Sequence, residues 1–126
     1  MKTPGGFTLI ELIVVLTIVS LLLTLAAPNY FQSIQRSKET ALKQNLATLR
    51  DAIDKYYSDQ GKYPEALGDL ISKRYLRALP QDPVTQSVET WITVTPPPDA
   101  NTPGQVYDVR SGAAGNAADG TAYAQW

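Results

Sequence analysis

The 126-residue chain contains no cysteine and no histidine. Without cysteine there is no disulfide framework, no thiolate zinc site and no cysteine nucleophile. Without histidine the chain lacks the commonest general base and the commonest ligand of transition metals. No combination of nucleophile, base and orienting group stands out among the remaining residues, so an enzyme is the least supported class of protein.

The chain also lacks an excess of basic residues. Its formal net charge is −1 and its isoelectric point is about 5.3, whereas a nucleic-acid binder usually carries a basic footprint. The local basic cluster, Lys73-Arg74 with Arg77, is interpreted as an ordinary solvated helix face. The alternative is a membrane-anchored domain that binds DNA or surfaces, and it would require steeply salt-dependent binding at this cluster.

Charge is scarcest at the amino end, where only Lys2 and Glu11 are charged within residues 1–27. Residues 7–27 read FTLIELIVVLTIVSLLLTLAA, which as a helix would be about 31 Å long, close to the hydrocarbon thickness of a bilayer. The apolar residues surround this helix instead of forming a stripe, which indicates a membrane span. The hydroxyls within the run are expected to donate to backbone carbonyls of the helix. They belong to Thr8, Thr17, Ser20 and Thr24.

Three interpretations compete for this segment. A cleaved secretory signal needs a short apolar region and a small-residue site, and Leu25-Ala26-Ala27 followed by Pro28 fits that poorly. A plain signal anchor is the second interpretation. The third rests on Glu11, a carboxylate that costs up to about 3 kcal/mol inside an apolar helix and less near its end. Glu11 either reaches the headgroups or is kept for a partner charge.

A short polar leader that ends in Gly5-Gly6 precedes the apolar run. Cleavage after Gly6 would give Phe7 a free α-amine four residues before Glu11, which is one helical turn. An ammonium and a carboxylate attract each other strongly in a medium of low dielectric constant.

The segment GGFTLIELIVVLTIVSLLLTLAAPNY resembles the amino-terminal region of type IV pilins and of the pseudopilins of type II secretion. The resemblance implies that a prepilin peptidase cuts after Gly6 and N-methylates Phe7. It also implies that Glu11 neutralises the terminal amine of the adjacent subunit during filament assembly. The positive-inside count disagrees with the orientation of a pilin, because Arg36, Lys38 and Lys43 follow the span while Lys2 precedes it.

Pro28 is expected to end or kink the span, because it lacks an N–H and clashes with the preceding turn. Residues 29–60 then resume helical spacing, and Gly61 is expected to stop the helix in a left-handed conformation. Residues 7–60 are thus predicted to form one long helix with an amphipathic second half. The predicted apolar stripe of that half consists of Ile34, Ala41, Leu42, Leu46, Leu49, Ile53, Tyr56 and Tyr57.

The pattern after Gly61 predicts a small α+β region. A short helix is expected over residues 65–76, strands over 91–95 and 105–110, and a stiff proline-rich loop between the two strands. The carboxyl-terminal tail is rich in glycine and alanine and would normally fray. Tyr123 and Trp126 are expected to pack and hold it.

The tail YDVRSGAAGNAADGTAYAQW resembles the end of the G-type major pseudopilins, in which a loop binds one calcium ion. Asp108, Ser111 and Asp119 match that pattern. The loop here is shorter, and Ala113-Ala114 stands where the family often has an acid. Calcium takes six to eight oxygen ligands, so the alternative is an ordinary Asp-Gly turn without a metal.

The sequence therefore predicts a pilin-like α+β fold, with a long amino-terminal helix packed on a small antiparallel sheet. The predicted parts are a cleaved leader (1–6), a transmembrane and filament-core helix (7–27), an amphipathic half-helix (28–60) and a small globular region (61–126).

The resemblance implies a structural subunit of a type II secretion pseudopilus. Such a subunit spans the inner membrane once, with its carboxyl-terminal region in the periplasm, before it enters the fibre. Its implied partners are further copies of the chain, minor pseudopilins, the prepilin peptidase and an inner-membrane assembly platform. The alternative is a major or minor pilin of a type IV pilus.

Overall fold

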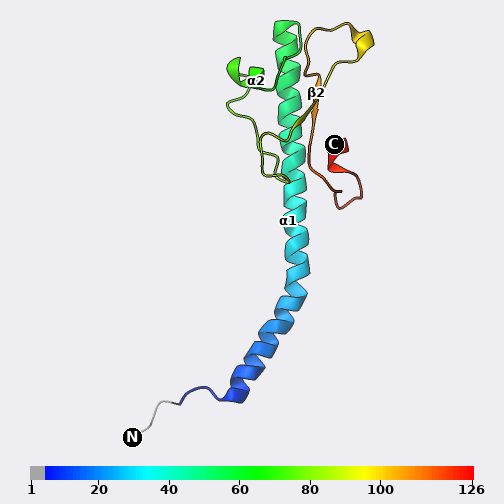
Figure 1. Cartoon of the computed structure of the whole chain (residues 1–126). Helices are drawn as coiled ribbons and strands as arrows, with labels where there is room; N and C mark the ends of the chain where they lie inside the picture. The colour runs from blue at the N-terminus through cyan, green and yellow to red at the C-terminus, as the bar shows by residue number, and fades with distance from the viewer. Residues whose placement is uncertain (1–4) are drawn as a thin grey trace. The chain divides into compact units, whose positions relative to one another are not determined.

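The computed structural model describes residues 5–126 (Figure 1). One helix of 52 residues, α1 (Leu9–Gln60), dominates the chain, and the remaining elements are short. They are the helix α2 (Gly68–Ser72), the strands β1 (Ile92–Val94) and β2 (Asp108–Arg110), and the 3-10 turns η1 (Pro98–Ala100) and η2 (Tyr123–Gln125). Most of the predicted leader, residues 1–4, lies outside the described residues.

The chain divides into two compact units, Met1–Gln35 and Arg36–Trp126, and α1 contributes to both. In the described part of the first unit the apolar side chains are exposed. α1 is the one helix of the described residues that is long and apolar enough to cross a membrane, and no residue of its most apolar window is buried. This unit thus has no apolar core of its own within the described chain.

Hydroxyl groups inside the apolar run are satisfied within the helix. Thr17, Ser20 and Thr24 donate to the carbonyls four residues earlier, at 2.7 to 2.8 Å. This confirms the prediction for these three residues. The prediction was wrong for Thr8, whose hydroxyl accepts the N–H of Glu11 instead. Thr8 precedes the first turn and so has no carbonyl four residues earlier in the helix.

Pro28 lies inside α1, which continues without interruption to Gln60. Of the two expected effects of Pro28, ending the helix is therefore wrong, and a kink stays a prediction. The neighbouring backbone hydrogen bonds of a long helix hold the chain helical on both sides of the one N–H that proline lacks. The helix ends where predicted, since Gly61 has a φ of +72° and donates its N–H to the Tyr57 carbonyl at 2.9 Å.

The Arg36–Trp126 unit has a continuous apolar core. Apolar side chains of α1 pack against the residues that surround the sheet and the tail. This confirms the predicted α+β, pilin-like fold. The buried core residues are Leu42, Leu46, Leu49, Ala52, Ile53, Tyr56, Leu70, Trp91, Val106, Val109, Ala113, Ala117 and Tyr123.

The predicted stripe on α1 is confirmed in its central part and wrong at its edges. Ile34, Ala41 and Tyr57 are exposed, whereas Ala52, which the stripe omitted, is only 3% exposed. A helix that packs on a small domain buries only the residues over which the domain extends. Tyr57 instead stacks on Tyr63, with 4.4 Å between the ring centroids.

The sheet consists of β1 and β2 in antiparallel register, with Thr93 opposite Val109. Both strands are shorter than the sequence predicted. The predicted helix over residues 65–76 is also shorter and spans Gly68–Ser72. Arg74 adopts a φ of +66°, a left-handed conformation that a helix cannot continue through.

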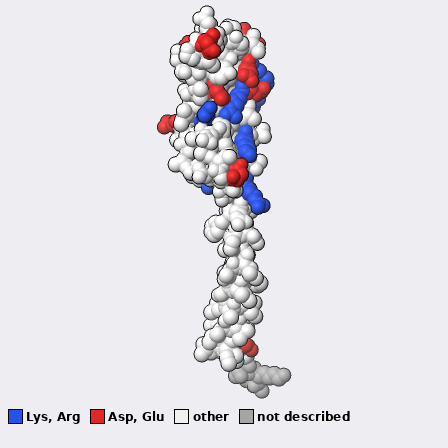
Figure 2. All heavy atoms as spheres, turned by 90° about the vertical axis from the view of Figure 1, so that its right-hand side faces the viewer, with Lys and Arg blue, Asp and Glu red and all other residues white. Residues whose placement is uncertain are grey.

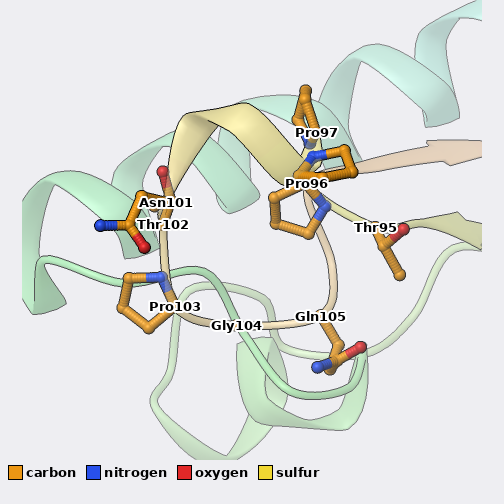
Figure 3. Close-up of a pocket in the computed structure, with 9 residues that line it drawn as sticks. Thr95, Pro96, Pro97, Asn101, Thr102, Pro103, Gly104 and Gln105 are labelled. Carbon is orange, nitrogen blue, oxygen red and sulfur yellow. The ribbon is translucent and has the colours of Figure 1, made fainter.

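The loop between the strands carries four prolines and is fastened to the turn that follows α1. The Tyr63 N–H donates to the Pro103 carbonyl at 3.0 Å, and the Val106 N–H donates to the Pro64 carbonyl at 2.8 Å. Figure 3 shows the loop curling around a shallow hollow lined by prolines. A Cβ on Gly104 would collide with the Tyr63 carbonyl, so this close approach requires glycine.

Candidate functional site

The predicted processing site lies on exposed chain ahead of α1. Gly5 to Thr8 are non-helical, and Phe7 is 91% exposed. A Cβ built on Gly5 or Gly6 would meet no atom within 4 Å. The peptide bond between Gly6 and Phe7 therefore lies in an accessible segment, as a peptidase substrate requires. Cleavage and methylation there stay predictions.

Thr8 and Glu11 form a reciprocal cap at the start of α1. The Thr8 N–H donates to Glu11 Oε2 at 3.2 Å, and the Glu11 N–H donates to Thr8 Oγ1 at 3.1 Å. The Thr8 carbonyl accepts the Leu12 N–H at 3.1 Å as α1 begins. Thr8 is thus the N-cap and Glu11 the third helical residue of a capping box. The Thr-x-x-Glu spacing at positions 8–11 is the signal in the sequence from which this cap could have been predicted.

The surroundings of Glu11 are otherwise apolar. Phe7, Ile10, Val14 and Val15 line a shallow open hollow beside it. Among residues 5–126 the ion pairs are Arg50 with Asp108 and Lys55 with Asp51, so Glu11 forms no ion pair within the described chain. The Glu11 carboxylate therefore lies at an apolar surface without a compensating cation from its own described residues.

Charged side chains are distributed very unequally over the molecule. Figure 2 shows basic and acidic atoms gathered over the Arg36–Trp126 unit, while the apolar stretch of α1 is almost free of them. No charged residue occurs between Leu12 and Gln35. Glu11 is consequently the single charged residue of the long apolar part of the helix.

At the other end of the chain, Asp108 is held by Arg50. The Arg50 Nε donates to Asp108 Oδ1 at 2.9 Å, and one terminal nitrogen of Arg50 donates to the carbonyl oxygens of Val109 and Trp126 at 3.0 and 2.8 Å. One guanidinium thus ties α1 to β2 and to the tail. No spacing signal in the sequence points to this role of Arg50.

Ser111 is fully buried and donates to the equally buried Asp82, with 2.6 Å between Ser111 Oγ and Asp82 Oδ2. The other carboxylate oxygen of Asp82 accepts the N–H groups of Val84 and Thr85 at 2.8 and 3.3 Å. Asp82 therefore accepts hydrogen bonds from three donors, one buried and two half-buried. Asp82 stands between Pro80 and Pro83 in the sequence, and no local pattern identifies it as a buried carboxylate.

Asp119 stabilises its own turn. Its Oδ1 accepts the hydroxyl and the N–H of Thr121 at 2.6 and 3.0 Å. These hydrogen bonds, with a smaller contribution from the positive charge of Lys43, lower the pKa of the Asp119 carboxyl below its ordinary value. The expected Asp-Gly turn is present, since the Gly120 N–H donates to the Ala117 carbonyl at 3.0 Å.

The structure does not bring Asp108, Ser111 and Asp119 together as one set of ligands. Each has a protein partner of its own, and the partner of Asp108 is a cation. No group of three or more acidic side chains that could hold a metal occurs in the part of the chain that the structure describes. The arrangement present therefore does not fit a calcium ion, and the expectation from the resemblance that these residues bind calcium remains untested.

Side chains of α1 hold the tail in place. Glu39 accepts the Tyr123 hydroxyl at 3.1 Å and the Ala118 N–H at 2.8 Å, and Lys43 lies 4.6 Å from the centre of a Trp126 ring. Tyr123 is buried, and Trp126 packs partly buried against the core. The expectation that these two aromatic residues hold the tail is thus confirmed in the structure.

Comparison with known proteins places these features in a family. Residues 1–27 match the Prokaryotic N-terminal methylation motif. The chain is 31% identical over 99 residues to the type II secretion system core protein G of Klebsiella pneumoniae, covering 66% of this chain and 71% of that protein. It is 30% identical over 98 residues to the corresponding protein of Aeromonas hydrophila, covering 65% and 68%.

A shorter match is to the type IV major pilin protein PilA of Myxococcus xanthus, 35% identical over 65 residues, which are 52% of this chain and 30% of that protein. No solved structure matches the chain. Three findings agree on the family of this chain. They are the methylation motif, the long apolar helix packed on a small antiparallel sheet, and the similarity over most of both chains. The chain belongs to the core protein G family of type II secretion pseudopilins, which are structural proteins and not enzymes.

Proposed function

We propose that this chain is a structural subunit of the periplasmic pseudopilus of a type II secretion system and that it assembles through its amino-terminal helix to drive protein export. The observation that carries the proposal is Glu11, a carboxylate on an exposed apolar helix with no ion pair among residues 5–126. A cation from a neighbouring copy would neutralise Glu11 in a water-poor helical bundle, where charge pairs are strong.

The neutralising cation is the α-amine of Phe7 after cleavage behind Gly6. The exposed, non-helical segment from Gly5 to Thr8 supports access by a prepilin peptidase. The match of residues 1–27 to the methylation motif supports N-methylation of Phe7, which retains the positive charge of the amine. Processing therefore creates the partner that Glu11 requires.

The proposed location is the bacterial inner membrane, with one span and the Arg36–Trp126 unit in the periplasm, followed by transfer into the fibre. The length and apolarity of α1 support the span. The proposed partners are further copies of the chain, minor pseudopilins, the peptidase and an assembly platform in the inner membrane. The charged face of the Arg36–Trp126 unit suits an aqueous compartment.

A subunit of a type IV pilus is the alternative function. The matches to core protein G extend over about two thirds of both chains, whereas the match to PilA covers 30% of that pilin. The extent of the match beyond the shared amino-terminal helix favours the secretion pseudopilus.

Deleting the gene in its native host tests the proposal directly. We expect the loss of exported proteins from the culture medium, with surface pili and twitching motility unchanged. Restoring the full chain should restore export. Normal export together with lost pili would assign the chain to a type IV pilus instead.

A further inference from the structure

Two adjacent aromatic side chains follow the apolar stretch of α1. Tyr30 and Phe31 are 63% and 67% exposed, and their rings meet edge to face with centroids 5.8 Å apart. In the Arg36–Trp126 unit, Tyr56, Trp91 and Tyr123 are at least 93% buried, and the exposed Tyr57 and Tyr107 are exposed to a smaller fraction, 38% and 44%. The two exposed rings therefore require contacts with an apolar or interfacial environment, which the described residues of the first unit do not provide.

The position of the pair along the helix points to that environment. Glu11 and Tyr30 are both in α1, and at about 1.5 Å per residue they lie about 28 Å apart along the axis. The hydrocarbon core of a bilayer is about 30 Å thick. No charged residue lies between Glu11 and Tyr30. A bilayer that places Glu11 at one boundary thus places the aromatic pair at the other.

We propose that Tyr30 and Phe31 form an interfacial anchor that fixes the depth of the helix in the membrane, with the lipid headgroup boundary as its partner. This inference rests on the membrane-inserted state proposed above. Tyrosine is favoured at that boundary because its ring enters the acyl region while its hydroxyl stays in the hydrated headgroups. Asn29, Gln32 and Ser33, which flank the pair, are polar and exposed, as residues at the edge of a span should be.

The anchor explains why a tyrosine stands at position 30 instead of a further aliphatic residue, and Phe31 supports it through the edge-to-face contact of the two rings. Leucine or isoleucine at position 30 would lengthen the apolar run and allow the helix to slide deeper, since these residues favour the hydrocarbon centre. Tyrosine opposes that movement, because its hydroxyl loses hydration in the acyl region. The same face could also be covered by a second copy of the chain, and the experiment below separates the two occupants.

The absence of cysteine allows single spin labels to be placed without background labelling. The full chain carrying Ser33→Cys or Ser20→Cys is labelled and reconstituted into vesicles of mixed phosphatidylethanolamine and phosphatidylglycerol. The depth of each label is measured from its accessibility to oxygen and to a water-soluble nickel complex. The test variant is Tyr30→Leu with Phe31→Leu, which keeps apolar bulk, and the matched control is Tyr30→Trp with Phe31→Trp, which keeps interfacial aromatic rings.

We expect the label at position 33 to move deeper by about 3 Å, the rise of two helical residues, in the leucine variant and to stay in place in the tryptophan variant. An unchanged depth in the leucine variant would overturn the anchor. Label–label broadening that disappears in the leucine variant at unchanged depth would also overturn it and assign the pair to a second copy. A label at position 20 that is exposed to water would instead contradict the membrane span itself.

Discussion

Thr8 and Glu11 cap each other at the first turn of α1, each donating its backbone N–H to the side chain of the other at 3.2 and 3.1 Å. Glu11 thus has a local role within its own chain in addition to the proposed role between chains. The cap orders the turn that carries the Glu11 carboxylate, and it ties one carboxylate oxygen to the Thr8 N–H.

Thr8→Ala should fray the start of α1. The variant loses the hydroxyl that accepts the Glu11 N–H, and an N-cap contributes roughly 1 kcal/mol, so we expect hydrogen exchange of the hydrogen-bonded amides of Glu11 and Leu12 to accelerate about fivefold. The protein is studied whole in detergent. Thr8→Ser keeps the hydroxyl and should exchange like the wild type. Equal exchange in Thr8→Ala and the wild type would show that the cap does not stabilise the helix.

Arg50→Met should loosen the carboxyl-terminal tail. It removes the hydrogen bonds to Asp108, Val109 and Trp126 while keeping a side chain of similar length, and we expect the free energy of unfolding to fall by about 1–2 kcal/mol. Unfolding is followed by tryptophan fluorescence, to which the core residue Trp91 and the tail residue Trp126 both contribute. The control is Lys55→Met, which removes an exposed pair with Asp51 and should leave the midpoint unchanged.

The same unfolding measurement bears on calcium. Because Asp108 is already paired with a guanidinium, we expect the wild-type midpoint to be equal in millimolar calcium and in chelator. A midpoint that rises with calcium would contradict this expectation and would show that an ion binds the folded state, as ligand linkage requires.

Asp82 and Ser111 should be strongly coupled energetically. Ser111→Ala removes one donor to the Asp82 carboxylate, and Asp82→Ala leaves the buried Ser111 hydroxyl and the half-buried N–H groups of Val84 and Thr85 without their acceptor. We expect a loss of about 1–3 kcal/mol for each single variant. In a double-mutant cycle, the double variant should lose less stability than the sum of the two single-variant losses. We expect this difference to be about 0.5 kcal/mol or more. Strict additivity would contradict the buried hydrogen bond.

Tyr63 should make the fold sensitive to alkali. Burial, then the nearby Tyr107, Tyr57 and Asp54, raise the pKa of the Tyr63 hydroxyl above its ordinary value. A raised pKa in the folded state gives stability that is present below about pH 10 and is lost as pH rises through the folded pKa. Between about pH 8 and pH 11 the midpoint of Tyr63→Phe should therefore fall less than that of the wild type. Equal falls would contradict the assignment.

The sequence predicted the long helix, its end at Gly61 and the α+β character, because these follow from local apolar periodicity and from one glycine. It did not predict the contacts of Arg50 or the burial of Asp82. Both depend on which segments distant in the sequence meet, since Arg50 and Asp108 are 58 positions apart in the sequence and Asp82 and Ser111 are 29 positions apart. The same limit applies to Asp108, Ser111 and Asp119, whose side chains face different partners although they are close in sequence.

The most direct test of the account is the fibre yield of Glu11→Gln. Glutamine also completes a capping box, so this variant removes the charge and retains the local cap. We expect wild-type membrane insertion and wild-type cleavage before Phe7, read by mass spectrometry of the mature protein. Fibre yield, measured by shearing and cross-linking, should fall more than about tenfold, because removing one partner of a buried ion pair costs several kcal/mol. A wild-type yield from correctly inserted and cleaved Glu11→Gln would contradict the account.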